Sequence, residues 1–297
     1  MNLSFSQSYF ILNIDSRAPV RAREEIMNRR LVPFAASAIA LGILFAGHSL
    51  AQNPPSAQTP VTPVSSVTSV PPAAPVLPTT KDILQKFETA IGGHAVWSGF
   101  TTRYIKGIYQ TEDASAFAAM EIFSKAPNKV LVKITFSNGI VLRQVCDGKA
   151  AWIEDPIGGT HMLTGAALES RIRQANFNDR TDGLLMGISG HILGAEKVGT
   201  HSTYVLEFSP EKKVTSKVYF DQESGYAIRA DSVFHREDGD YKVENYMDDY
   251  RPVDGAYFAF RMRHVEKGNV FTVRVTQIKN NVPVDDSLFF KPASAPK

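Results

Sequence analysis

The chain has 297 residues, of which 32 are Lys or Arg and 30 are Asp or Glu, so its formal net charge is +2. Its one cysteine, Cys146, excludes an internal disulfide, a zinc site of paired cysteines and a Cys-x-x-Cys-His haem attachment. Residues 1–51 hold 5 of the basic and 3 of the acidic residues, so 27 of each sign remain after them. A neutral domain lacks the positive field that attracts nucleic acids, and we expect no nucleic-acid binding.

Residues 27–51 have the three parts of a secretory signal peptide. Arg29 and Arg30 give a positive start, an apolar run follows, and small side chains precede the expected cut. We therefore expect cleavage between Ala51 and Gln52 and export to the periplasm or a comparable space outside the cytoplasm. A membrane anchor is the alternative, but the apolar run is at the short limit of the about 20 residues that span a bilayer.

Residues 1–26 fit no part of a signal peptide, because Asp15, Glu24 and Glu25 are unusual ahead of an apolar run. A simple explanation is that translation starts at Met27 and that the start at residue 1 is mis-assigned. A disordered extension is the alternative. The cleavage site has no cysteine for lipid attachment. The sequence thus predicts no stable membrane anchor after cleavage.

Residues 52–80 are rich in Pro, Ala, Ser, Thr and Val and carry no charge. Such a segment cannot bury enough surface to fold and favours extended conformations, which predicts a disordered linker. A tail without a role is the alternative. The composition changes at Lys81, and residues 81–297 are enough for one domain with a large core.

An amphipathic helix is predicted at the start of this domain. Thr79 or Thr80 can cap it, apolar residues recur at helical spacing over Ile83–Ile91, and Gly92-Gly93 ends it. A second helix is predicted over Leu163–Asn176.

In this second helix, Leu168, Ile172 and Ala175 share one face, whereas Glu169, Arg171 and Arg173 are expected on other faces. The glycine-rich stretch 177–193 is interpreted as a loop with a short helix.

From about residue 101 the apolar residues alternate with polar ones, as in Val130, Val132 and Ile134 with Lys129 and Lys133 between or beside them. This period of two, broken by Asn-Gly and Asp-Gly turn signals, predicts ten or eleven antiparallel strands with one buried face. Two packed sheets are one way to cover that face. Because few helices are available, we favour a mainly β fold, a strongly curled antiparallel half-barrel with a helical lid.

Signals for catalysis are sparse. No two histidines have zinc-ligand spacing, there is no Gly-x-Ser-x-Gly motif, and the acidic residues around 237–249 lack the spacing of a calcium loop. Cys146 lies in a predicted strand and is best interpreted as a buried thiol. We therefore predict no enzyme, no catalytic residue, no metal and no cofactor, although a hydrolase site assembled by the fold is a third possibility.

The order of these features resembles the LolA/LolB-like family of outer-membrane lipoprotein-sorting proteins, as an uncharacterised relative. The resemblance covers about residues 80–293 and consists of the following segments: the helix 83–93 ending in Gly-Gly, Lys106-Gly107, Asp147-Gly148-Lys149 before Ala151-Trp152, the helical insertion after it, the hairpin 249–261, and the closing segment 272–292. It implies a half-open curled barrel with a helical lid, whose apolar cavity receives lipoprotein acyl chains in the carriers. Other relatives sense lipids or envelope stress. No functional residue transfers directly.

Two functions follow as hypotheses. The first is a non-catalytic carrier or sensor of a lipid or lipid-modified protein, since burying acyl chains gains about 0.8 kcal/mol per methylene. The second is an envelope module with a closed core and no ligand, which binds another envelope protein through its edges or linker. For the first, we expect a ligand cavity lined by Met120, Ile122, Val132, Ile134, Phe136, Leu206, Phe208, Phe220 and Phe260.

Overall fold

The structure of the protein, a computed structural model, describes residues 77–112, 117–155, 159–177, 190–211, 214–236 and 239–291. The predicted signal peptide with its cleavage site at Ala51 and Gln52, the extension 1–26, and all but the last residues of the linker lie outside the described residues.

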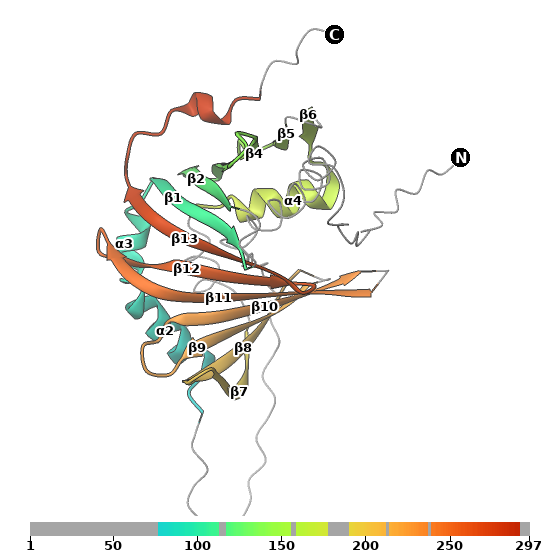
Figure 1. Cartoon of the computed structure of the whole chain (residues 1–297). Helices are drawn as coiled ribbons and strands as arrows, with labels where there is room; N and C mark the ends of the chain where they lie inside the picture. Colours follow the sequence, from blue (N-terminus) through green and yellow to red (C-terminus); the bar gives the residue numbers. More distant parts are fainter. Residues whose placement is uncertain are drawn as a thin grey trace, which may run out of the picture.

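The described part is built on one antiparallel sheet of 13 strands (Figure 1). The strands are β1 (Thr102–Thr111), β2 (Phe117–Lys125), β3 (Lys129–Phe136), β4 (Val141–Cys146), β5 (Ala151–Asp155), β6 (Gly159–Met162), β7 (His191–Val198), β8 (His201–Glu211), β9 (Val214–Asp221), β10 (Ala227–Arg236), β11 (Gly239–Val253), β12 (Ala256–Glu266) and β13 (Asn269–Asn280).

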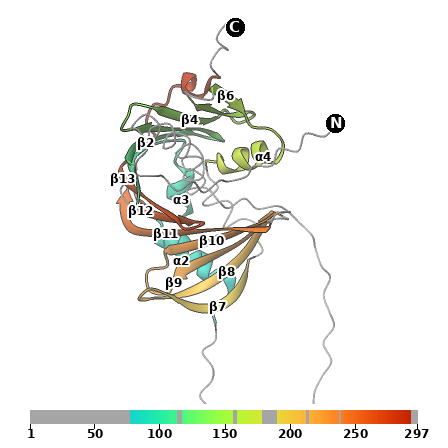
Figure 2. The ribbon, with the colours of Figure 1, turned by 45° about the vertical axis from the view of Figure 1, so that its right-hand side comes forward.

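The strand order is β6-β5-β4-β3-β2-β1-β13-β12-β11-β10-β9-β8-β7. The sheet therefore consists of two meanders, β1–β6 and β7–β13, which the pairing of β1 with β13 joins into one. It curls into a C shape with β6 and β7 as its edges (Figure 2). The predicted curled half-barrel is thus confirmed.

The sheet has more strands than the ten or eleven that we expected. β6 has four residues, all exposed, so it is too short to show an alternating pattern. β7 begins at His191, inside the stretch 177–193 that the sequence assigned to a loop. Its residues are mostly exposed, and a bulge between Ile192 and Gly194 interrupts its register. Edge strands of this kind lack the buried face on which period-two prediction depends.

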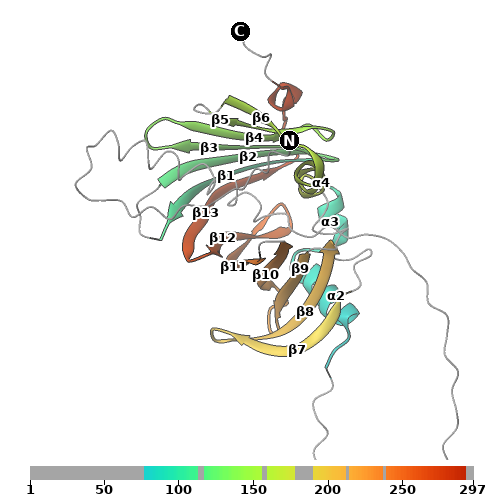
Figure 3. The same ribbon diagram turned by 90° about the vertical axis from the view of Figure 1, so that its right-hand side faces the viewer.

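The described residues form three α-helices along the sheet: α2 (Thr80–Ala90), α3 (His94–Ser98) and α4 (Gly165–Gln174) (Figure 3). Thr79 caps α2 as expected, and its hydroxyl accepts a bond from Asp82 N at 3.2 Å while its own N–H donates to the Asp82 carboxylate at 2.9 Å. A 3₁₀ helix, η2 (Asp286–Phe289), follows β13. None of the described helices combines the length and the apolar character that crossing a membrane requires.

The buried apolar residues form three clusters. Two lie on the concave face of the sheet, and α2 and α3 cover one of them while α4 covers the other. The third lies on the convex face of β3–β5, where Val145 and Trp152 pack against Phe289 of η2. The second meander thus has α2 and α3 on its concave face. The first meander has α4 on its concave face and η2 on its convex face.

Candidate functional site

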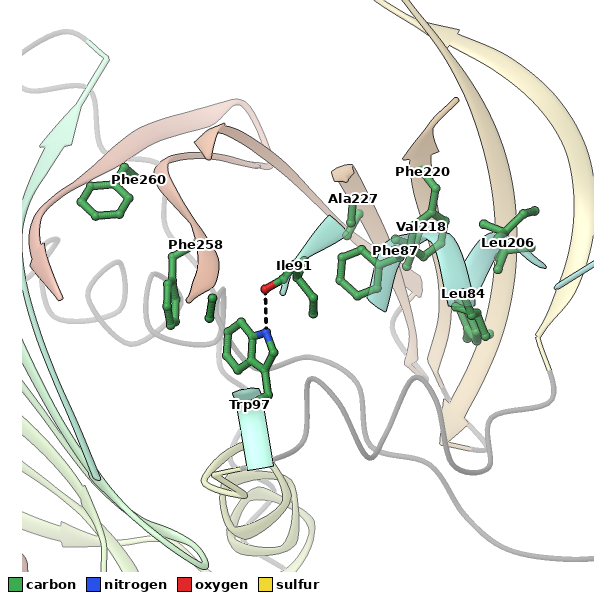
Figure 4. Packing of buried hydrophobic residues seen from close by; sticks show 14 of the residues in the cluster. Leu84, Phe87, Ile91, Trp97, Leu206, Val218, Phe220, Ala227, Phe258 and Phe260 are labelled. Carbon is green, nitrogen blue, oxygen red and sulfur yellow. Dashed lines mark hydrogen bonds between the residues drawn. The ribbon is translucent and has the colours of Figure 1, made fainter. Parts of the chain in front are cut away.

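The concave face is the candidate site because the sequence prediction placed the ligand there. Its first cluster contains α2, α3 and strands β8–β10, β12 and β13 (Figure 4). Phe87 of α2 meets Phe220 of β9 edge to face, with ring centroids 5.4 Å apart, and Trp97 of α3 packs on Phe258 of β12 at 4.8 Å. The helices therefore contact the strands directly through aromatic side chains.

One carbonyl fixes the end of α2 in this cluster. The oxygen of Ile91 accepts bonds from the indole Nε1 of Trp97 and from the backbone N of Tyr257, each at 2.9 Å (Figure 4). The chain can turn here because Gly92 has φ +110°, and a Cβ on Gly92 would collide with the carbonyl oxygen of Gly255. The Gly-Gly pair thus ends the helix, as predicted, and also lets it approach the β11–β12 turn closely.

The second cluster lies between α4 and strands β1–β5, β12 and β13. Leu168 and Ile172 of α4 pack against it, which confirms their predicted shared face. Tyr109 of β1 and Phe271 of β13 belong to this cluster, and their ring centroids are 4.8 Å apart.

The structure divides the nine predicted lining residues between the two clusters. Leu206, Phe208, Phe220 and Phe260 belong to the first cluster, and Met120, Val132, Ile134 and Phe136 belong to the second, with Ile122 partly buried against it. They therefore share the concave face but do not form one group. Their role as the lining of a ligand cavity stays a prediction.

The two clusters meet where the sheet bends. The register of β1 against β13 shifts between Lys106 and Gly107, and Met262 of β12 packs against both clusters. A Cβ on Gly107 would lie 2.8 Å from the carbonyl oxygen of Arg274 and 3.3 Å from the Met120 side chain. Glycine at this point allows the two strands to approach closely.

The concave face also holds a buried arginine that the sequence did not single out. Arg103 of β1 is 8% exposed, and its Nε donates to Asn280 at 2.7 Å. Its guanidinium lies over four aromatic rings, at 4.9 to 5.5 Å from the centroids of Trp97, Phe100, Phe177 and Phe258. The rings offer their negative faces to the charge, so Arg103 links α3, β1 and β12.

For a second arginine, Arg171, the predicted position on the helix is wrong. Arg171 was expected away from the apolar face of α4, but it is only 7% exposed. The reason is helical spacing, because position 171 lies three residues after Leu168 and four before Ala175 and so falls on the same face. Burial lowers the pKa of Arg171 to about 10. A long side chain with an apolar stem can occupy such a buried position. The sequence analysis expected Arg171 on another face because it considered only the charge of the side chain.

The hydrogen-bond acceptor of this arginine on the sheet is Gln144 of β4. It is 2% exposed and lies on the concave face between its strand partners Val132 and Ile153. Arg171 Nη2 donates to Gln144 Oε1, and Arg171 Nη1 lies 3.5 Å from Gln174 Oε1. The sequence did contain one signal for this residue, since Gln144 is a polar residue at the inward parity of β4, between Leu142 and Cys146.

The described residues were also compared with the sequence expectations for a metal site and for Cys146. They contain no group of three or more His, Cys, Asp or Glu that could hold a metal ion. Cys146 is fully buried, as predicted, and burial raises the pKa of its thiol, while nearby Arg171 acts in the opposite direction. A buried, protonated thiol is a poor nucleophile.

Solved structures with a similar fold are known. A DUF1329 family protein from Desulfovibrio piger matches with a TM-score of 0.50 and 14% identity, over 71% of this chain and 95% of that chain. The protein shares this fold. The LolA superfamily protein NE2245 from Nitrosomonas europaea gives 0.48 and 16%, over 72% and 99% of the two chains. A domain assigned to outer membrane lipoprotein sorting, from Vibrio parahaemolyticus, gives 0.49 and 12%, over 71% and 95%.

At such identities the likeness concerns the fold alone. No protein-family model matches the sequence, and no curated protein matches it.

Proposed function

We propose that this protein is a non-catalytic carrier or sensor that binds an apolar ligand after export to the periplasm. The ligand is a lipid or the acyl chains of a lipid-modified protein. The observation that carries the proposal is the extent of the apolar concave face. Ten of the 13 described strands contribute buried side chains to it, and three described helices cover it. Acyl chains on this face would gain about 0.8 kcal/mol for each methylene removed from water.

Native mass spectrometry of protein purified from its own cell envelope tests this proposal. We expect a co-purifying lipid, and we expect the lipid-free protein to bind a fluorescent fatty acid. The absence of both would overturn the proposal.

An envelope module with a closed core is the second candidate, and the tight first cluster favours it. Leu206, Phe208 and Val218 have no exposed surface, and Phe87 contacts Phe220 directly. In this case the partner is another envelope protein that adds to an edge strand. Both edges carry exposed apolar side chains, Met162 on β6 at 42% and Leu193 on β7 at 46%.

Overpacking separates the two candidates. Val132→Phe adds volume to the second cluster, where Val132 is 1% exposed. In a carrier the larger ring fills ligand space, so fatty-acid binding falls while stability changes little. In a closed core it costs about 1–3 kcal/mol of unfolding free energy and no ligand binds at all. Thr135→Phe in the same strand is the matched control, because Thr135 alternates to the opposite face.

A further inference from the structure

Among the described residues, no carboxylate compensates the charge of the polar pair inside the second cluster. Arg171 is 7% exposed and Gln144 is 2% exposed, and the hydrogen bonds of the guanidinium go to two amide oxygens, those of Gln144 and Gln174. Within the described residues, Arg171 forms no ion pair with an Asp or Glu. A buried arginine normally pairs with a carboxylate, because removing its charge from water costs several kcal/mol.

The side-chain amide of Gln144, the other member of the pair, also has donors that are not used in hydrogen bonds. The Nε2 atom of Gln144 is buried without a hydrogen-bond partner, although an amide NH2 can donate two bonds. Buried donors are seldom left unsatisfied, since each costs about 1–3 kcal/mol. The guanidinium and this amide are therefore neighbouring donors in an apolar surrounding, and no described residue offers them an acceptor that carries negative charge.

We infer that Arg171 and Gln144 form the anion-binding end of a ligand site in the second cluster, and that the ligand is a lipid with a carboxylate or phosphate head group. This inference rests on the proposed function and specifies its ligand. A planar carboxylate can accept two parallel bonds from a guanidinium, and a phosphate can do the same. The acyl chain lies against the apolar residues of the same cluster, from α4 and β3.

The apolar surrounding makes the site selective. Inside the cluster the charge of Arg171 is screened little by water, so a neutral head group of the same size leaves the charge uncompensated. An anionic lipid is therefore preferred over its neutral analogue. In the first cluster, Arg103 already faces four aromatic rings and Asn280, so the inference concerns the half of the sheet that α4 covers.

Fluorescence titration of the purified full-length protein tests the inference. The probes are 11-(dansylamino)undecanoic acid and its neutral primary amide, which have the same chain and fluorophore. We expect the wild-type protein to bind the carboxylate about tenfold or more tightly than the amide, as a charge-assisted hydrogen bond provides. Arg171→Met should remove this preference by weakening carboxylate binding while amide binding persists. Gln144→Leu should weaken carboxylate binding by a smaller factor.

The matched control is Arg143→Met in the same strand as Gln144. Arg143 alternates to the convex face, where its Nη1 pairs with Glu154 at 3.0 Å. The control should bind both probes as the wild type does. Unchanged amide binding by Arg171→Met also shows that the variant is folded.

The outcomes separate this inference from the proposed function. If the wild-type protein and Arg171→Met bind both probes equally well, the anion site is wrong and the apolar carrier stands. If neither probe binds, both fail. Competition with dodecyl phosphate and with inorganic phosphate distinguishes the source of the anion. Displacement of the carboxylate probe by dodecyl phosphate alone supports a lipid head group, whereas equal displacement by inorganic phosphate overturns the lipid form of the inference.

Discussion

At the scale of single residues, the two buried arginines of the concave face differ in how their charge is compensated. Arg103 faces aromatic rings and one amide oxygen, while the acceptors of Arg171 in the described part of the chain are amide oxygens. Neither could be assigned from composition, because charged residues are usually predicted to be exposed. The inward parity of Gln144 and the helical spacing of Arg171 were readable in the sequence, but their meeting across β4 and α4 needed the tertiary structure.

Replacing the Arg171–Gln144 pair with apolar residues should stabilise the ligand-free protein. We expect the double variant Arg171→Met/Gln144→Leu to gain about 1–4 kcal/mol of unfolding free energy, because the desolvation cost of the charge disappears. Urea denaturation measures this change. Gln144→Leu alone should lose stability, since it leaves the guanidinium without its main acceptor, and a more stable single variant would contradict this account.

Asp221 at the end of β9 gives a pH-dependent prediction. Burial acts to raise its pKa, but bonds from the N–H of Ser224 at 2.8 Å, from its hydroxyl at 2.6 Å and from His201 outweigh burial, so the pKa is lowered. The folded carboxyl holds its proton less tightly than the unfolded one. This contribution to stability is therefore present above the unfolded pKa of about 3.9 and is lost as the pH falls through the folded pKa.

Asp221→Asn should remove that contribution. We expect a loss of about 1–3 kcal/mol at pH 7 and a weaker fall in stability with acid, both measured by urea denaturation across the pH range. Asp240→Asn, at an exposed carboxylate on β11, is the control. An acid dependence identical in Asp221→Asn and the wild type would refute the role of this carboxylate.

At the scale of elements, local patterns predicted what depends on neighbouring residues. The cap at Thr79, the Gly-Gly end of α2 and the apolar face of α4 all follow from spacings of a few residues, and the structure confirms them. The short helix α3 has five residues and no side-chain cap, so it carries no such pattern. Edge strands β6 and β7 contain no fully buried residue, so the contrast between a buried and an exposed face on which period-two prediction depends is weak in them.

Gly92 offers a test of how α2 joins the sheet. We expect Gly92→Ala to lose more than about 1 kcal/mol of unfolding free energy, because φ is +110° and the new Cβ would meet the Gly255 carbonyl oxygen. Gly93→Ala is the matched control. Its φ is also positive, at +84°, but no atom lies within 4 Å of the added Cβ, so its loss should be smaller. Chemical denaturation of both variants checks the order, and equal losses would mean that backbone strain alone matters.

At the scale of the whole molecule, the curled sheet was predictable because a long meander with few helices has few ways to cover its apolar face. The division of that face into two clusters was not. It depends on the β1–β13 pairing, which joins residues about 170 positions apart, as in Ile105 opposite Ile278. Alternation indicates which residues point inward, but not which of them meet.

All three apolar clusters lie between Ile83 and Phe289. We therefore expect a chain of residues 77–297 to fold without the preceding segments. Its midpoint of thermal unfolding should match that of the chain starting at Gln52, as followed by circular dichroism. A clearly lower midpoint would show that residues 52–76 contribute to the fold and would contradict the predicted linker.

The bend at Gly107 has a consequence for cooperativity. Because Met262 alone among the described apolar residues packs against both clusters, the two halves of one continuous sheet are stabilised largely by separate contacts. Each half can then open by partial unfolding at its own free-energy cost. Hydrogen exchange would divide the backbone amides of β2–β5 and of β8–β11 into two groups with different protection, and pairs of core substitutions in opposite halves would be additive.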